Sequence, residues 1–142
     1  MDNNFTFVIR SSSKENTTDN TNDCSIRLMG LPQQFRYFEA TVSALHVSTV
    51  GATIATSTFE LRQDGMNMVN GIDTKNNALK TVAFSTYNNG TYPQGPYQFK
   101  FENCNGRSIK FQLYQDDGAL LKNGGSSYNL TWILVLNLVG YN

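Results

Sequence analysis

Charged residues are scarce in this 142-residue chain. Asp, Glu, Lys and Arg make up 15% of it, against roughly one quarter in an average soluble domain. Eleven cations balance eleven anions, and the densest basic stretch, 107–110, contains only two cations. A protein that binds nucleic-acid phosphates carries a basic patch or arm, so we expect no direct contact with nucleic acid. A net charge of zero also does little to keep copies of the chain apart.

Histidine and cysteine are nearly absent, which removes most of the chemistry of active sites and metal sites. His46 is the only histidine, and no sequence motif provides it with a nucleophile or an orienting carboxylate, so we interpret it as structural. One histidine and two distant cysteines cannot supply the ligands of an ordinary zinc site. Asp116 and Asp117 lack the spacing of a calcium-binding loop. Motifs for phosphate binding and for nucleophile elbows are missing as well. We therefore expect no metal, no cofactor and no enzymatic activity.

The cysteine count and the lengths of the apolar runs indicate the cellular compartment in which the chain folds. Cys24 and Cys104 cannot form a disulfide framework, and they are either two thiols or one bridge, with thiols the favoured interpretation. Residues 1–4 lack the basic start of a signal peptide, and no apolar run follows them. The apolar run 130–139 is about ten residues long, whereas a membrane helix needs about twenty. We expect folding in the cytoplasm and no membrane span.

Residues typical of strands and turns take the place of the missing charges. Asn, Ser, Thr and Gly replace the Glu, Lys and Arg of helical surfaces, and the chain contains nine Phe and seven Tyr. Apolar and polar residues alternate in short segments, and turn-forming clusters separate these segments. The pattern predicts one all-β domain that spans 1–142 and has eight strands. The predicted strands are 5–10, 24–28, 37–50, 55–62, 79–87, 97–102, 108–115 and 128–139.

Two details of this pattern concern the middle of the chain. Strict alternation over 37–50 predicts Val42, Ala44 and His46 on one face of that strand. Asn105-Gly106 is the strongest short hairpin signal in the chain, and it predicts a hairpin that joins 97–102 to 108–115.

The last predicted strand is apolar on both faces. Trp132, Leu134 and Leu136 point one way, as do Leu130 and Leu138, while Ile133, Val135 and Val139 point the other way. Such a strand is central in its sheet and is covered on both sides. Since one sandwich has one core, the second face must meet loops or another chain. Ile133, Val135 and Val139 are therefore candidate interface residues.

Two predicted loops also carry apolar side chains that could contact a partner. Tyr92 and Tyr97 flank a proline-rich turn, and Leu120 and Leu121 lie in a polar, glycine-rich loop. Apolar residues in loops either anchor the loop on its own domain or contact a partner. Both alternatives stay open, and we include these four residues in the candidate interface.

Eight strands with uneven loops fit a jelly-roll sandwich of two antiparallel sheets. With the strands lettered B to I in chain order, the expected sheets are B-I-D-G and C-H-E-F. The strand pattern, the size and the apolar last strand resemble those of single-jelly-roll capsid proteins of large double-stranded DNA viruses. The nearest likeness is to the vertex (penton) proteins that accompany double-jelly-roll major capsid proteins. The resemblance implies a homo-pentamer at an icosahedral vertex, in contact with a major capsid protein, in a virion capsid made in the host cytoplasm.

Two other functions fit the same class of fold. One is a trimeric receptor-binding or tumour-necrosis-factor-like head, and the other is a carbohydrate-binding module. A carbohydrate-binding module displays Trp or Tyr on a groove, and the predicted burial of Trp132 counts against it. Fold class by itself does not choose among the three.

Overall fold

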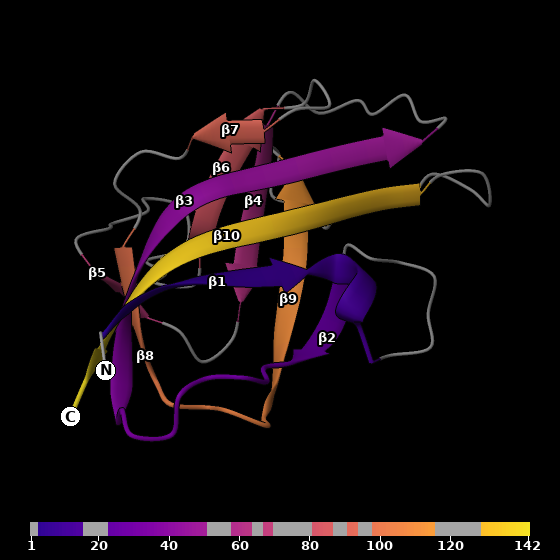
Figure 1. The fold of residues 1–142 in the computed structure, drawn as a ribbon. Helices are drawn as coiled ribbons and strands as arrows, with labels where there is room; N and C mark the ends of the chain where they lie inside the picture. The colour runs from indigo at the N-terminus through magenta and orange to yellow at the C-terminus, as the bar shows by residue number, and fades with distance from the viewer. Residues whose placement is uncertain are drawn as a thin grey trace.

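Two antiparallel β-sheets packed face to face make up the described part of the protein (Figure 1). The computed structural model describes residues 3–15, 23–50, 58–63, 67–69, 81–86, 91–93, 98–115 and 129–142. Apart from one short 3-10 turn, η1 (Ser11–Ser13), the regular elements in these ranges are all strands, so the all-β class is confirmed. Within the same ranges no helix has the length and hydropathy to cross a membrane.

The first sheet has the strand order β1-β10-β3-β8-β5, and β7 also pairs with β3. The second sheet has the order β2-β9-β4-β6, and every pairing in both sheets is antiparallel. In Figure 1 the strands β3, β10 and β1 lie in front of the second sheet. The bounds are β1 Asn4–Arg10, β2 Asp23–Arg27, β3 Tyr37–Val50, β4 Thr58–Gln63, β5 Asn67–Val69, β6 Thr81–Thr86, β7 Thr91–Pro93, β8 Gln98–Glu102, β9 Ser108–Gln115 and β10 Asn129–Tyr141.

The predicted count of eight strands is not confirmed, because β5 and β7 lie in segments that were predicted to be loops. Each has three residues, too few to show an alternating pattern. β5 pairs with β8, and β7 pairs with β3, so both strands form where an existing strand offers backbone partners. β10 also continues to Tyr141, beyond the predicted end at 139.

The predicted hairpin at Asn105-Gly106 is wrong. β8 belongs to the first sheet and β9 to the second, so the turn carries the chain from one sheet to the other. The Arg107 N–H donates to the Cys104 carbonyl at 2.8 Å, and Gly106 has a φ of 83°, as the third position of a type II turn requires. The strong local turn signal was correct, but it does not specify which strands the turn joins.

Long-range hydrogen bonds hold this turn against the segment that leads into β3. The Asn103 side-chain amide donates to the carbonyls of Pro32 and Phe35, at 3.0 and 2.9 Å. The Asn105 side-chain carbonyl accepts from the Leu31 N–H at 2.9 Å. Asparagine side chains thus satisfy backbone groups that no sheet could reach.

The core lies between the two sheets and is closely packed. Phe38 and Phe99 of the first sheet and Phe111 of the second are fully buried. Trp132 of β10 is 1% exposed, and its ring centroid lies 5.5 Å from that of Phe111 across the interface of the sheets. The burial of Trp132 follows the prediction from the alternation in the last strand.

The two cysteines are buried thiols, as the favoured interpretation predicted. Burial is the main cause of a raised pKa at the Cys104 thiol, and the nearby Arg107 charge opposes it only in part. Cys104 therefore stays protonated at neutral pH, which makes it a poor nucleophile.

A bulge in β3 decides which residues face the core. Val135 pairs with Ala44, but the next residue, Leu136, pairs with Val42, so Ser43 is an extra residue in β3. Val42 and Leu45 are both buried as a result. The predicted face that combined Val42 with Ala44 and His46 is therefore wrong, since Ala44 and His46 pair with Val135 and Ile133 on the opposite side.

A small ion-paired network connects η1 to the second sheet and predicts an acid sensitivity. Glu15 accepts from Arg27 Nε at 2.8 Å and from Ser108 Oγ at 2.5 Å. The hydrogen bond from Ser108 is the main cause of a lowered pKa at Glu15, and the hydrogen bond from Arg27 adds to it. A lowered pKa in the folded state adds stability above the unfolded pKa, and that stability is lost as the pH falls through the folded value.

We therefore expect Glu15→Gln to be slightly less stable than wild type at neutral pH, by a small amount because the pair is exposed, and the two proteins to converge as the pH falls through the folded pKa of Glu15. Melting temperatures of the two proteins between pH 3 and pH 7 provide the measurement. The same acid dependence in both proteins would contradict a role for Glu15.

Candidate interaction surface

The outer face of the first sheet, which points away from the second sheet, is the surface that the structure describes most fully. β10 lies at its centre, with β1 on one side and β3 on the other. Residues on these three strands form cross-strand rows. In order along β10, the rows are Arg10–Ile133–His46, Val8–Val135–Ala44, Thr6–Asn137–Thr41 and Asn4–Val139–Glu39.

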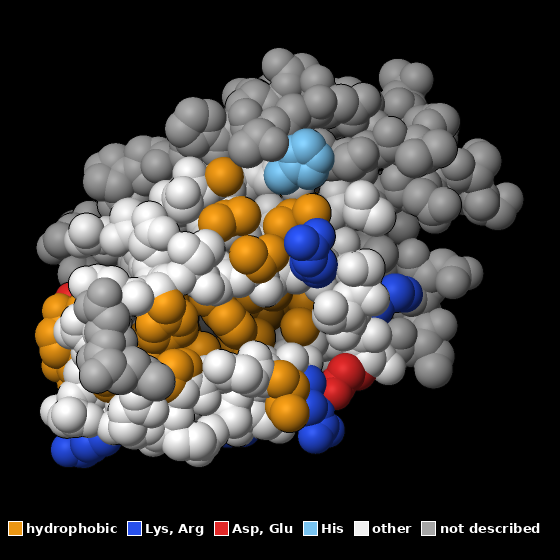
Figure 2. Space-filling model, viewed as in Figure 1, with side chains coloured by type: hydrophobic (Ala, Val, Ile, Leu, Met, Phe, Trp, Pro, Cys, Tyr) orange, Lys and Arg blue, Asp and Glu red, His pale blue; other side chains and the backbone are white. Residues whose placement is uncertain are grey.

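Val8, Ala44, Ile133 and Val135 form an apolar patch on this face. Val8 is 41% exposed, and the other three are half-buried. Figure 2 shows hydrophobic side chains gathered beside the single histidine on this side of the molecule. Single exposed apolar side chains are common on protein surfaces, so the interest of these four lies in their being neighbours on one face.

Arg10 and His46 border the apolar patch at one end. Arg10 and His46 stand on either side of Ile133, in the same cross-strand row. The guanidinium of Arg10 is exposed, and His46 is partly exposed. The apolar patch therefore has one end at which a partner's carboxylate fits by charge.

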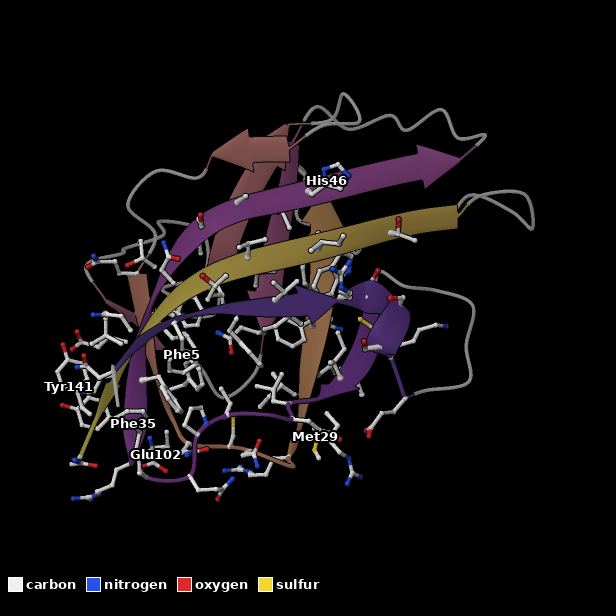
Figure 3. All side chains as sticks on the ribbon, viewed as in Figure 1. Phe5, Met29, Phe35, His46, Glu102 and Tyr141 are labelled. Carbon is white, nitrogen blue, oxygen red and sulfur yellow. The ribbon has the colours of Figure 1, made fainter. Side chains whose placement is uncertain are left out.

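The opposite end of the outer face is aromatic and carries charges of both signs. Tyr37 and Tyr141 stack with ring centroids 5.1 Å apart, and Lys100 Nζ lies 4.2 Å from the Tyr37 ring centroid. The negative charge of Glu39 is the main cause of a raised pKa at Tyr141, and desolvation and a hydrogen bond to Glu39 add to it. Figure 3 shows Tyr141 and His46 at opposite ends of the sheet. The two ends of the face thus present different kinds of side chain.

The structure places three of the seven candidate interface residues on this face. Ile133 and Val135 lie together in the apolar patch, both half-buried. Val139 points to the same side, but the polar row that contains Asn137 separates it from Val135. The three residues therefore do not form one continuous apolar surface.

The remaining four candidates belong to the predicted loops. Tyr92 lies in β7, where its backbone pairs with Leu45, and its side chain is outside the described residues. Tyr97, Leu120 and Leu121 also lie outside the described residues.

Sequence reasoning missed the contributions of β1 and β3 to the apolar patch. Val8 is out of phase with Phe5, Phe7 and Ile9 in its own strand, a signal that alternation does contain. Its position beside Val135 depends on the pairing of β1 with β10, which the alternation does not specify. Ala44 was assigned to the wrong side because of the bulge at Ser43.

Side chains suited to contact with a partner are present among the described residues. Among them, no three His, Cys, Asp or Glu side chains gather in a way that could hold a metal ion. The outer face offers apolar area, an arginine and an aromatic pair, which are residue types common at protein interfaces. No protein-family model matches the chain, and no curated protein matches it in sequence.

Proposed function

We propose that this protein is a structural capsid protein, the pentameric vertex (penton) subunit of an icosahedral DNA virus. The observation that carries the proposal is the apolar patch on β1, β10 and β3. The core of the sandwich is filled by other residues, so the patch contributes nothing to packing between the sheets. Contact with another subunit gives these side chains a role.

The strand orders support a jelly roll as the architecture of this subunit. With the short strands β5 and β7 set aside, the sheets run β1-β10-β3-β8 and β2-β9-β4-β6. In chain order these strands correspond to the letters B-I-D-G and C-H-E-F. The likeness concerns fold, which many unrelated functions share, so the assembly itself needs a direct test.

A closed ring explains how a small apolar patch can hold subunits together. One contact of a few apolar side chains is weak after the entropic cost of association. Closure of a ring repeats the same contact around the symmetry axis, so the contacts reinforce one another. A net charge of zero leaves little repulsion between copies. We expect the isolated protein to associate weakly and to be ordered as a ring against a major capsid protein in the virion, without direct contact with the genome.

One of the alternative functions meets a specific difficulty. The single tryptophan, Trp132, is 1% exposed and packs on Phe111, so it cannot serve as a platform for a sugar ring. This counts against a carbohydrate-binding module. A trimeric head domain has the same fold requirements as a vertex subunit and differs from it in the number of copies.

Copy number is therefore the decisive test. We expect native mass spectrometry of purified protein to show monomers with a small, concentration-dependent fraction of oligomers. We expect mass measurement of vertex complexes released from particles to show five copies. Three copies would support the receptor-binding head instead, and absence of the protein from particles would refute the capsid role.

A further inference from the structure

β1 is an edge strand of the first sheet as far as the chain is described. It pairs with β10 over all seven of its residues, in a register that runs without a break from Asn4 to Arg10. No strand in the described part of the chain pairs with its other side. It is the longest of the edge strands in the two sheets as described. An open edge presents backbone donors and acceptors that are ready to pair with another chain.

The pattern of hydrogen bonds between β1 and β10 shows which residues of β1 point their backbone groups away from β10. The Gly140 N–H donates to the Asn3 carbonyl at 2.8 Å, which makes Asn3 and Gly140 a hydrogen-bonded pair. In an antiparallel ladder such pairs alternate, so Phe5, Phe7 and Ile9 also bond to β10. The backbone N–H and C=O groups of the even-numbered residues then point away from β10. These residues are Asn4, Thr6, Val8 and Arg10.

The strand lacks the features that commonly protect an edge. Its sequence contains no proline, lysine or glycine, and its register has no bulge. The β2 edge of the second sheet differs, since Lys14 forms a bridge with Ile26 and the Glu15 N–H donates to the Ser25 carbonyl at 2.7 Å. Among the described residues, no segment pairs with the outer side of β1, whereas the β2 edge has such partners.

The core is also incompletely closed along β1. Phe5 and Phe7 face inward and pack against the core, but both remain half-buried, whereas Ile9 is buried. The Phe5 ring lies edge-on to Phe38 with centroids 5.8 Å apart. In Figure 2 a hollow with hydrophobic side chains at its floor lies beside this strand. A strand added to β1 would cover this apolar surface.

We propose that β1 pairs with β1 of a second copy, antiparallel and about a two-fold axis at Phe7, to make one continuous sheet across a dimer. This register joins Thr6 to the partner copy's Val8 and Asn4 to its Arg10 through hydrogen-bonded pairs. Shifting the centre to Thr6 or Val8 removes one of these pairs from within the strand. Phe7 of one copy lies opposite Phe7 of the other at a non-hydrogen-bonded position, where side chains approach most closely.

The sequence of β1 favours a second copy as the occupant of this edge. In the register centred on Phe7, Phe5 lies opposite Ile9 on the inner side, so apolar residues meet apolar residues. Arg10 is the only charged residue in the strand, and it lies opposite Asn4 rather than a like charge. The dimer uses the edge of the sheet, whereas the proposed ring uses its outer face, so this inference does not depend on the ring.

Thr6→Pro tests the pairing because proline removes an edge-directed N–H and leaves the ladder to β10 intact. Thr6→Val is the matched control, since it keeps the N–H. We expect wild type and Thr6→Val to form a concentration-dependent dimer in native mass spectrometry and size-exclusion chromatography, and Thr6→Pro to be monomeric. Wild-type protein that stays monomeric up to its solubility limit, or a dimer unaffected by Thr6→Pro, would overturn the proposal.

Amide hydrogen exchange of the wild type gives a readout that does not depend on a variant. The N–H groups of Thr6 and Val8 should exchange more slowly as protein concentration rises, while those of Phe5 and Phe7 are protected at all concentrations. Equal exchange of Thr6 and Val8 at low and high concentration would refute edge pairing. The proposed ring has five copies and the proposed edge dimer has two, so the two species have different masses. Failure to detect the dimer would therefore leave the ring untouched, and failure to detect the ring would leave the dimer untouched.

Discussion

Ile133→Asp is expected to abolish ring assembly and incorporation into particles while the domain stays folded. Ile133 is half-buried on the outer face, and Val135 and Val8 continue the apolar patch from it. Burying each such side chain against a neighbour contributes about 1.5–3 kcal/mol before the cost of association. An aspartate in the contact loses that contribution and must also be desolvated, a penalty that is repeated at every contact of the ring.

The fold should tolerate this change because the position is solvent-accessible and Arg10 stands beside it in the next strand. Val135→Asp places the charge in a more apolar setting than Ile133→Asp does, since the cross-strand neighbours of Val135, Val8 and Ala44, are both apolar. Asn137→Asp is the control, as it adds the same charge to the same face at an exposed position in a polar row.

Circular dichroism, native mass spectrometry and recovery of the protein in particles measure the outcome. We expect native-like spectra for all three variants, with assembly lost for Ile133→Asp and Val135→Asp and retained for Asn137→Asp. If the first two variants assemble normally, the apolar patch is covered within the subunit and the proposed interface is wrong.

Gly140→Ala is expected to destabilise the fold, although it adds only one methyl group. A Cβ at Gly140 would lie 2.5 Å from two ring atoms of Phe35, which is closer than non-bonded carbon atoms approach each other in proteins. Phe35 is itself buried and packs against Phe38 with centroids 6.0 Å apart, so its ring has little room to move. Overpacking of this kind costs about 1–3 kcal/mol. Urea denaturation of the two proteins measures the difference in the free energy of unfolding.

A double-mutant cycle with Phe35→Leu tests the cause. The smaller side chain should relieve the contact, so the double variant is expected to be less destabilised than the sum of the two single variants. Gly106→Ala provides the control, since a Cβ there meets nothing within 4 Å and the cost comes from its positive φ. Gly106→Ala and Phe35→Leu should therefore be additive. Additive effects for Gly140→Ala and Phe35→Leu would contradict the packing explanation.

Alternation in the sequence was sufficient to predict the class of fold and the two faces of the last strand. Trp132, Leu134 and Leu136 are buried, and Ile133 and Val135 are half-buried on the other side, as their positions in the pattern predict. This succeeds because the side-chain period of a strand is a local property of the backbone. The same locality explains the error at Ala44 and His46, where one extra residue in β3 reverses the phase.

The sequence by itself determined that the chain forms strands, that Asn105-Gly106 makes a turn, and that β10 is apolar on both sides. Only the tertiary structure decided that the turn joins two different sheets and that Val8 lies beside Val135. It also decided that β1 lies at the end of its sheet in the described part of the chain. Strand propensity and turn geometry arise from neighbours in sequence, whereas the pairing of strands depends on how distant segments together bury one core.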